Sequence, residues 1–343
     1  MRTRSAILVA SLALAAGQAH AQQNRVYICP DDHTDYFWSD SDEAYRGAFQ
    51  RMIDYYLNQA DLTQNNPSDF RQRWHCDGNL WLWEYEKTKP AADYQRLISR
   101  LRDGTISVAM NPLVINNGGS PAEAVIRGMY YPGRVERREG LRFRLAMYQE
   151  NSAFPLGLPS LWAGSGAKYS WKGVCDCDTR IPGATNRPHE VYRATGLDGS
   201  SVLMKWQSLF SGGANQSIGG YAEAYDPAAV VDAVTTNAPF NGFAAKWPFQ
   251  VIGAIGRGWD GFEYESTEFV SVAQQKSNPS RRVIVGAITD FFDDFTATYP
   301  PATLPAVALS FGNEWDAYSC TMAEQTARIR RAAITTVIGP NGA

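Results

Sequence analysis

Residues 25–56, RVYICPDDHTDYFWSDSDEAYRGAFQRMIDYY, contain a complete strand–loop–helix unit. The apolar run 25–29 predicts a strand, because short runs of β-branched and aromatic residues are typical of buried strands. A helix is expected after the loop, and Ser39 or Asp40 can cap its first turn. Its buried face is expected to consist of five apolar residues at helical spacing: Tyr45, Phe49, Met52, Ile53 and Tyr56. Such a unit is the building block of α/β folds.

The alternation of apolar strands and helical segments continues along the chain. Further strands are expected at 71–76, 105–111, 141–149, around 169, and at 201–206, 249–256 and 281–288. A helix is also expected near the end of the chain, around 328–331. About seven or eight strands separated by helical segments favour either a parallel α/β barrel or a doubly wound sheet.

The first 21 residues have the pattern of a secretory signal peptide. They begin with basic residues, continue with a short apolar run and end in the small-x-small sequence Ala19-His20-Ala21. The apolar run is too short to span a bilayer, which needs about 20 residues, and no later stretch is long and apolar enough. We therefore expect a periplasmic or secreted protein whose mature chain is 22–343.

The composition narrows the choice of partner. A formal net charge of −3 provides no basic surface for nucleic acid. Ten Trp and seventeen Tyr are suited either to a core rich in aromatic residues or to stacking on sugar rings. The five cysteines are an odd number, so at least one has no partner within the chain, and Cys175 and Cys177 are too close in sequence to bridge each other readily.

Polar residues follow several of the predicted strands. In a parallel barrel, active sites lie at the carboxyl ends of the strands, so these residues are the candidates for chemistry. They are Asp31, Asp32, His33, Asp35, His75, Asp77, Glu150, Asn151, Trp259, Asp260, Asp290 and, near the end of the chain, Glu314 and Asp316. Any single aspartate among them can equally be a helix cap or a turn residue. His33 and Asp35 combine an imidazole with a carboxylate, which are ligands that suit zinc.

The stretch DDHTDYFW, residues 31–38, resembles a motif of glycoside hydrolase family 38, the zinc-dependent retaining α-mannosidases. In the catalytic barrel of that family the first strand ends in H-x-H-x-D, with Trp three residues later. His33, Asp35 and Trp38 match this pattern, and Asp31 stands in place of the first histidine. The resemblance implies that His33 and Asp35 bind one zinc ion and that Trp38 stacks on the sugar.

Two further stretches carry the resemblance. In AMYQENSAFPLGLPSLWAGSG, Glu150 falls where the family has the aspartate that is both nucleophile and zinc ligand. In VIGAIGRGWDGF, Asp260 falls on the general acid/base. The stretches RWHCDGNLWLWE and GNEWDAYSCTMAEQTARIRRA are weaker matches to the second strand and to a Gly-acid-Trp run of bacterial relatives. Asp316 is expected as the fourth zinc ligand, with His189 as its rival.

The resemblance implies a distorted parallel (β/α) barrel of about seven strands with a C-terminal helix, occupying 22–343. The later helical and β-sandwich domains of the family are then absent or truncated. The implied function is an exported metal-dependent retaining glycoside hydrolase that acts on an α-mannoside-like oligo- or polysaccharide. The expected substrate contacts are Trp38, Asp77, Trp259 and Asp290. Two alternatives stay open: a non-catalytic carbohydrate-binding barrel, and a metal-dependent polysaccharide deacetylase, which also uses His and Asp ligands.

Overall fold

The computed structural model describes residues 23–113, 120–148, 154–172, 189–206, 223–235, 247–256, 263, 265–308, 310 and 322–338. Its strands are β1 (Asn24–Cys29), β2 (Trp74–Cys76), β3 (Ile106–Val108), β4 (Leu145–Tyr148), β5 (Tyr169–Lys172), β6 (Val191–Thr195), β7 (Ser201–Trp206), β8 (Val251–Ile255), β9 (Arg281–Val285) and β10 (Ala306–Val307). Its α-helices are α1 (Asp42–Thr63), α2 (Asn79–Thr88), α3 (Ala91–Arg102), α4 (Ala122–Gly128), α5 (Tyr130–Glu139), α6 (Leu158–Gly164), α7 (Pro227–Thr235), α9 (Glu268–Lys276), α10 (Ile288–Thr298) and α12 (Ala323–Ile338). Two short 3₁₀ helices are η1 (Ser68–Phe70) and η3 (Pro301–Thr303).

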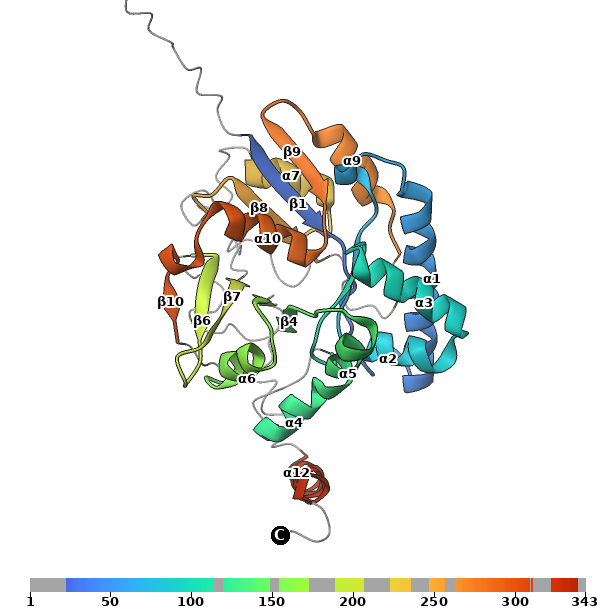
Figure 1. Cartoon of the computed structure of the whole chain (residues 1–343), viewed down its shortest axis with the longest axis vertical. Helices are drawn as coiled ribbons and strands as arrows, with labels where there is room; N and C mark the ends of the chain where they lie inside the picture. The colour runs from blue at the N-terminus through green and yellow to red at the C-terminus, as the bar shows by residue number, and fades with distance from the viewer. Residues whose placement is uncertain are drawn as a thin grey trace, which may run out of the picture.

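The first strand lies at the centre of a parallel sheet (Figure 1). β1 pairs with β8 on one side and with β9 on the other, so Arg25 lies opposite both Val251 and Arg282. All five residues of β8 are buried, as expected for a parallel strand that is covered on both faces. The strands predicted at 25–29, 249–256 and 281–288 are therefore confirmed, although the last two are shorter than predicted and residue 288 begins α10, and the three form one sheet.

At the carboxyl end of β1, the backbone hydrogen bonds change from one neighbouring strand to another. The Ile28 carbonyl accepts a hydrogen bond from the backbone N–H of Gly286, which follows β9 (3.2 Å). The next carbonyl on that side, of Pro30, accepts instead from His75 of β2 (3.0 Å). An isolated parallel bridge joins Asp31 to His75 as well. β2 thus begins alongside the end of β1, and the first two polar loops lie together.

The remaining strands extend this arrangement and include one antiparallel pair. β2 pairs with β3, and the N–H of Met110 donates to the Leu145 carbonyl at the start of β4 (2.9 Å). The third sheet has the order β10-β6-β7-β5-β4, in which β6 and β7 are antiparallel and the other pairs are parallel. The expectation of about seven parallel strands is therefore corrected to ten strands in the described part of the chain. The fold is α/β with mainly parallel pairing.

The helix after β1 forms as its amphipathic spacing predicts. Tyr45, Phe49, Met52, Ile53 and Tyr56 are all buried on one face of α1. They pack with residues of α2, α3, β2 and β3 in one hydrophobic cluster, while a second cluster lies around β1, β8 and β9.

The N-cap of this helix is Ser41, and the prediction of Ser39 or Asp40 was wrong. The Ser41 side chain accepts from the N–H of Ala44 (3.3 Å). Asp40 is one residue too early for that role, and its carboxylate accepts from the N–H of Ser41 instead (2.6 Å). The backbone N–H of Ser39 donates to the Tyr45 hydroxyl (3.1 Å).

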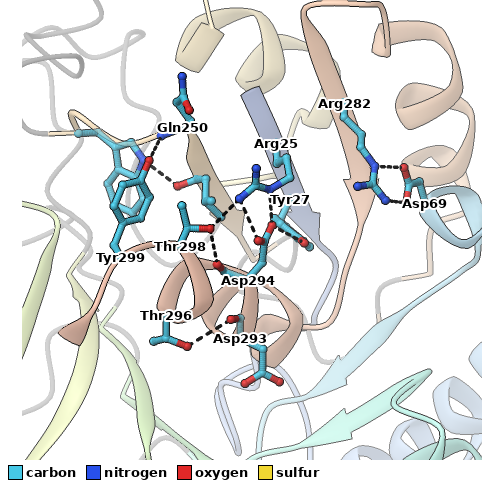
Figure 2. A network of polar contacts seen from close by, with 12 residues as sticks. Arg25, Tyr27, Asp69, Gln250, Arg282, Asp293, Asp294, Thr296, Thr298 and Tyr299 are labelled. Carbon is cyan, nitrogen blue, oxygen red and sulfur yellow. Dashed lines mark hydrogen bonds and ion pairs between the residues drawn. The ribbon is translucent and has the colours of Figure 1, made fainter. Parts of the chain in front are cut away.

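A polar network fastens α10 to β1 (Figure 2). The Asp294 carboxylate accepts from Arg25 Nε (2.6 Å) and Nη2 (2.9 Å) and from the Tyr27 hydroxyl (2.9 Å). Arg25 Nη2 also donates to Thr298 Oγ1 one turn further along the helix (2.8 Å). Two adjacent positions on the same helix face therefore bind one strand residue, which fixes α10 across the central sheet. At the edge of that sheet, Arg282 of β9 pairs with Asp69 of η1 (Figure 2).

Two observations concern the cysteines and the membrane. Cys29 and Cys76 are buried free thiols, and the other three cysteines lie outside the described residues. Among the helices described, none has the length and apolar character needed to cross a bilayer.

Candidate active site

The loop after β1 brings an imidazole and a carboxylate together. His33 Nε2 lies 2.8 Å from Asp35 Oδ1, so the two side chains converge although one residue separates them. His33 is fully buried, and 14 % of the Asp35 side chain is exposed. Two atoms this close can both lie about 2.0 to 2.2 Å from one point, which is the range of zinc–nitrogen and zinc–oxygen bonds. The pair therefore fits two ligands of one zinc ion.

The residue between these two is held by the second polar loop. The backbone N–H of Thr34 donates to Asp77 Oδ2 (2.8 Å), and the indole N–H of Trp81 donates to Thr34 Oγ1 (3.2 Å). Asp77 is buried after β2, and burial raises its pKa to about 6. The next residue, Gly78, packs closely on the backbone of Pro112, because a Cβ atom at position 78 would lie 2.0 Å from the Pro112 carbonyl oxygen. In the structure, Asp77 therefore contacts the backbone of the His33–Asp35 loop.

Several buried polar atoms next to this loop lack hydrogen-bond partners among the described residues. They include both carboxylate oxygens of Asp32, Asp77 Oδ1 and His75 Nε2. Burial, with the nearby carboxylate of Asp77 as a second cause, raises the pKa of Asp32 well above its ordinary range. Burial lowers the pKa of His75 to about 3, so this imidazole is neutral, and its Nδ1 lies 2.6 Å from Ser107 Oγ. The loops after β1 and β2 thus enclose a region that favours bound protons or a cation.

The aromatic residues that follow the loop point outward. Trp38 is 67 % exposed, and its backbone N–H donates to the Asp35 carbonyl (2.8 Å), which closes a four-residue turn. Phe37, the third residue of that turn, is 62 % exposed. Trp38 is therefore not a core residue, and it stands on the outer side of the loop that carries His33 and Asp35.

Asp290 lies where the sequence places it, after β9, but it serves a helix. Its Oδ2 accepts from the backbone N–H of Ala287 (2.9 Å), the N-cap residue of α10. Arg73 Nε lies 3.9 Å from the same oxygen. Burial raises the pKa of Asp290. These contacts are those of a capping residue.

The other site residues expected from the sequence lie outside the described residues: Glu150, Trp259, Asp260 and Asp316. Their flanking strands are described. β4 ends at Tyr148, and β8 runs parallel to β1 with Ile255 opposite Cys29, so the chain leaves β8 at the edge where the His33 loop begins. Beyond that gap, Glu263 accepts hydrogen bonds from Arg51 of α1 (2.9 and 2.6 Å). Within the described ranges, no three His, Cys, Asp or Glu side chains gather closely enough to hold a metal ion.

A buried ion pair near β8 was not expected from the sequence. Lys205 of β7 pairs with Glu223, and both side chains are almost fully buried. Glu223 Oε2 also accepts from the N–H of Ile255 (2.9 Å), and the Lys205 ammonium lies 5.7 Å from the centre of the Trp247 ring. The sequence does contain a signal for a buried charge at Lys205, because a lysine lies inside the apolar run SVLMKW. His189, the rival zinc ligand, is exposed.

Comparison with known proteins shows which solved structures share this fold. No protein-family model matches the sequence, and no curated protein matches it. Among solved structures, an α-mannosidase from Enterococcus faecalis V583 superposes with a TM-score of 0.62 at 14 % identity, over 84 % of this chain and 31 % of that one. A glycosyl hydrolase family 38 protein from Enterococcus faecalis gives 0.52 at 14 % identity, over 84 % and 29 %.

A 4-α-glucanotransferase from Thermococcus litoralis gives a TM-score of 0.55 at 11 % identity, over 92 % of this chain and 48 % of that one. The chain thus shares the α/β fold of these three proteins. Its fold is like that of the two glycoside hydrolase family 38 structures, the family that the DDHTDYFW stretch resembles. It spans about a third of the length of the two family 38 structures.

Proposed function

We propose that the protein is an exported, zinc-dependent retaining glycoside hydrolase that acts on α-mannosides or related glycans. One observation carries the proposal: His33 and Asp35 converge to 2.8 Å at the carboxyl end of β1, in a fold shared with family 38 proteins. Parallel α/β enzymes hold their reactive groups at this edge. The buried carboxyl groups of Asp32 and Asp77 lie in the same region and favour a bound proton or a cation there.

In this proposal one zinc ion is held by His33, Asp35 and Glu150, with Asp316 or solvent as the fourth ligand. When bound, it supplies Lewis-acid polarisation of oxygen atoms of the sugar. Asp77 keeps the loop between His33 and Asp35 in place through its hydrogen bond from Thr34. The two ligands of that loop are thereby oriented before any ion binds.

The chain's two candidate carboxylates have opposite tasks. Glu150 acts as the nucleophile and has to be ionised, while Asp260 protonates the leaving oxygen and has to hold a proton at the start. An apolar neighbour such as Trp259 favours the protonated form of Asp260. In a retaining enzyme the two carboxyl groups stand about 5 to 5.5 Å apart.

Substrate binding is assigned to the rim of the same region. Trp38 offers an exposed ring for stacking on a sugar, and Trp259 is expected to add a second one from the segment after β8. Asp77 and Asp290 are the acids expected to approach sugar hydroxyls, although their observed contacts are to the Thr34 and Ala287 backbone.

The test combines metal analysis with a panel of aryl glycosides. Purified protein is expected to contain about one zinc ion per chain and to hydrolyse 4-nitrophenyl α-mannoside, with the anomeric configuration of the first product retained in proton NMR. N-terminal sequencing of the mature protein is expected to begin at Gln22. A protein without zinc that binds glycans but hydrolyses none of the panel would establish the non-catalytic carbohydrate-binding barrel instead.

A further inference from the structure

The turn that ends at Trp38 contains a backbone conformation that few residues adopt. Phe37 has φ +70°, and among the described residues it is the one non-glycine residue with a positive φ. It occupies the third position of the turn closed by the hydrogen bond from the Trp38 N–H to the Asp35 carbonyl. Glycine is the favoured residue there, because a side chain at positive φ is strained. Strain of this kind persists where the surrounding structure imposes it, and it clusters at functional sites.

The surrounding contacts hold this turn firmly. The Tyr45 hydroxyl of α1 hydrogen-bonds to the Asp35 carbonyl and accepts from the N–H of Ser39, so one side chain ties together both ends of the turn. The Tyr36 hydroxyl hydrogen-bonds to Asp42 in the first turn of α1. The strained conformation is therefore fixed from both sides.

The Phe37 ring itself packs against other aromatic rings on its inner side. It meets the Tyr36 ring edge to face, with 4.7 Å between the ring centres and 72° between the planes. Tyr36 in turn stacks on Phe49, and Phe49 stacks on Trp81, whose indole N–H donates to Thr34. A column of rings thus runs from the buried side of the His33–Asp35 loop to the surface.

Folding alone does not account for a phenylalanine at this position. The side chain is 62 % exposed, so the core gains little from it, and glycine would relieve the strain. Yet the position presents a large ring that packs on Tyr36 and is followed in the chain by the exposed ring of Trp38. Rigid aromatic rings bind ligands well because little side-chain freedom is lost on binding.

We propose that Phe37 and Trp38 together form an aromatic platform that contacts two sugar units of a glycan chain next to the His33–Asp35 pair. This inference rests on the proposed function and specifies its substrate as an oligosaccharide, not a single sugar. The apolar faces of sugar rings pack on aromatic side chains, and two neighbouring exposed rings provide two such contacts.

The test compares Phe37→Gly, Phe37→Ala and the control Tyr130→Ala, which removes an exposed aromatic ring from α5. Binding of mannotriose is measured by calorimetry, thermal unfolding is followed in parallel, and the turnover of 4-nitrophenyl α-mannoside is recorded. Phe37→Gly is expected to unfold at or above the wild-type temperature and to bind mannotriose about tenfold more weakly. Phe37→Ala should lose the same affinity for mannotriose. It should unfold at a lower temperature than Phe37→Gly, because alanine at this positive φ keeps the backbone strain that glycine relieves. Tyr130→Ala should bind as the wild type does.

Three results would overturn the platform: mannotriose affinity of Phe37→Gly within about twofold of the wild type, absence of mannotriose binding by the wild type, or a wild-type dimer that Phe37→Gly converts to a monomer. A different result would refute the proposed hydrolase function: a protein that binds glycans but contains no zinc and shows no turnover. That result would leave the aromatic platform intact. Conversely, turnover of the aryl mannoside with no effect of Phe37 substitutions on mannotriose would refute the platform alone.

Discussion

Asn in place of Asp77 is expected to stabilise the metal-free protein at neutral pH. The carboxyl group is buried, and its pKa in the folded protein is about 6, against an ordinary value of 3.8. Between these pH values the folded chain binds more protons than the unfolded chain, so the free energy of unfolding falls as the pH rises through this window. The difference between the two pKa values corresponds to about 3 kcal/mol, which is lost in full above pH 6.

The substitution preserves the contact that positions the loop. Asparagine keeps a side-chain oxygen that can accept the hydrogen bond from Thr34, but it carries no charge to be buried. Asp77→Asn should therefore match the wild type near pH 4 and exceed it by up to about 3 kcal/mol at pH 8. Asp77→Ala is the matched control: it also removes the charge, but it leaves the Thr34 N–H without its acceptor and should be less stable than Asp77→Asn by about 1 to 3 kcal/mol.

The measurement is urea unfolding of EDTA-treated, reduced protein at pH 4, 5, 6, 7 and 8, followed by tryptophan fluorescence. The reductant keeps the buried thiols of Cys29 and Cys76 from oxidising once the chain unfolds. A stability difference between Asp77→Asn and the wild type that is the same at pH 4 and pH 8 would show that Asp77 does not titrate between these values. A variant that is less stable than the wild type at pH 8 would refute the reasoning altogether.

Three further outcomes can be checked. His33→Ala and Asp35→Asn should each lower the zinc content from about one ion per chain towards zero in plasma mass spectrometry, while the circular dichroism spectrum is unchanged. Glu150→Gln should abolish turnover, and full activity of this variant would contradict the role of Glu150 as nucleophile. Asp260→Asn should slow the hydrolysis of glycosides with poor leaving groups far more than that of activated aryl glycosides. Asp294→Ala should lower the free energy of unfolding by about 2 to 3 kcal/mol, because it leaves two partly buried donors of β1 unpaired, and a urea midpoint equal to that of the wild type would disprove this.

Local pattern was enough to predict the elements whose neighbours lie close in sequence. The five apolar residues of α1 are buried as their spacing indicates, and β1, β8 and β9 occupy their predicted runs. β6 was missed because VYRAT is short and only partly apolar. The turn after it contained a usable signal, Asp198-Gly199, with Gly199 at φ +81°, which is typical of the turn between two antiparallel strands.

The site was harder to predict, because burial and partners depend on contacts between distant segments. Asp290 has the sequence context of an active-site acid, but the backbone of α10 takes up one of its oxygens. Asp32 reads as an ordinary loop residue, yet it is buried near the carboxylate of Asp77, without a hydrogen-bond partner among the described residues. The convergence of His33 and Asp35 could be expected, because it needs only a bend within three residues.

The central position of β1 has a consequence for the order in which the chain can fold. Arg25 pairs with Val251 and Arg282, and the Ile28 carbonyl pairs with Gly286, so one edge of the first strand stays open until β8 has been made and the other until β9 has been made. Pairings this distant slow folding, because a long loop has to close before they form. Until β8 has been made, the apolar strand VYIC has two open edges and is prone to pair with other chains. The same strand that carries the candidate ligand loop is therefore also a segment through which nascent chains of this protein are exposed to aggregation.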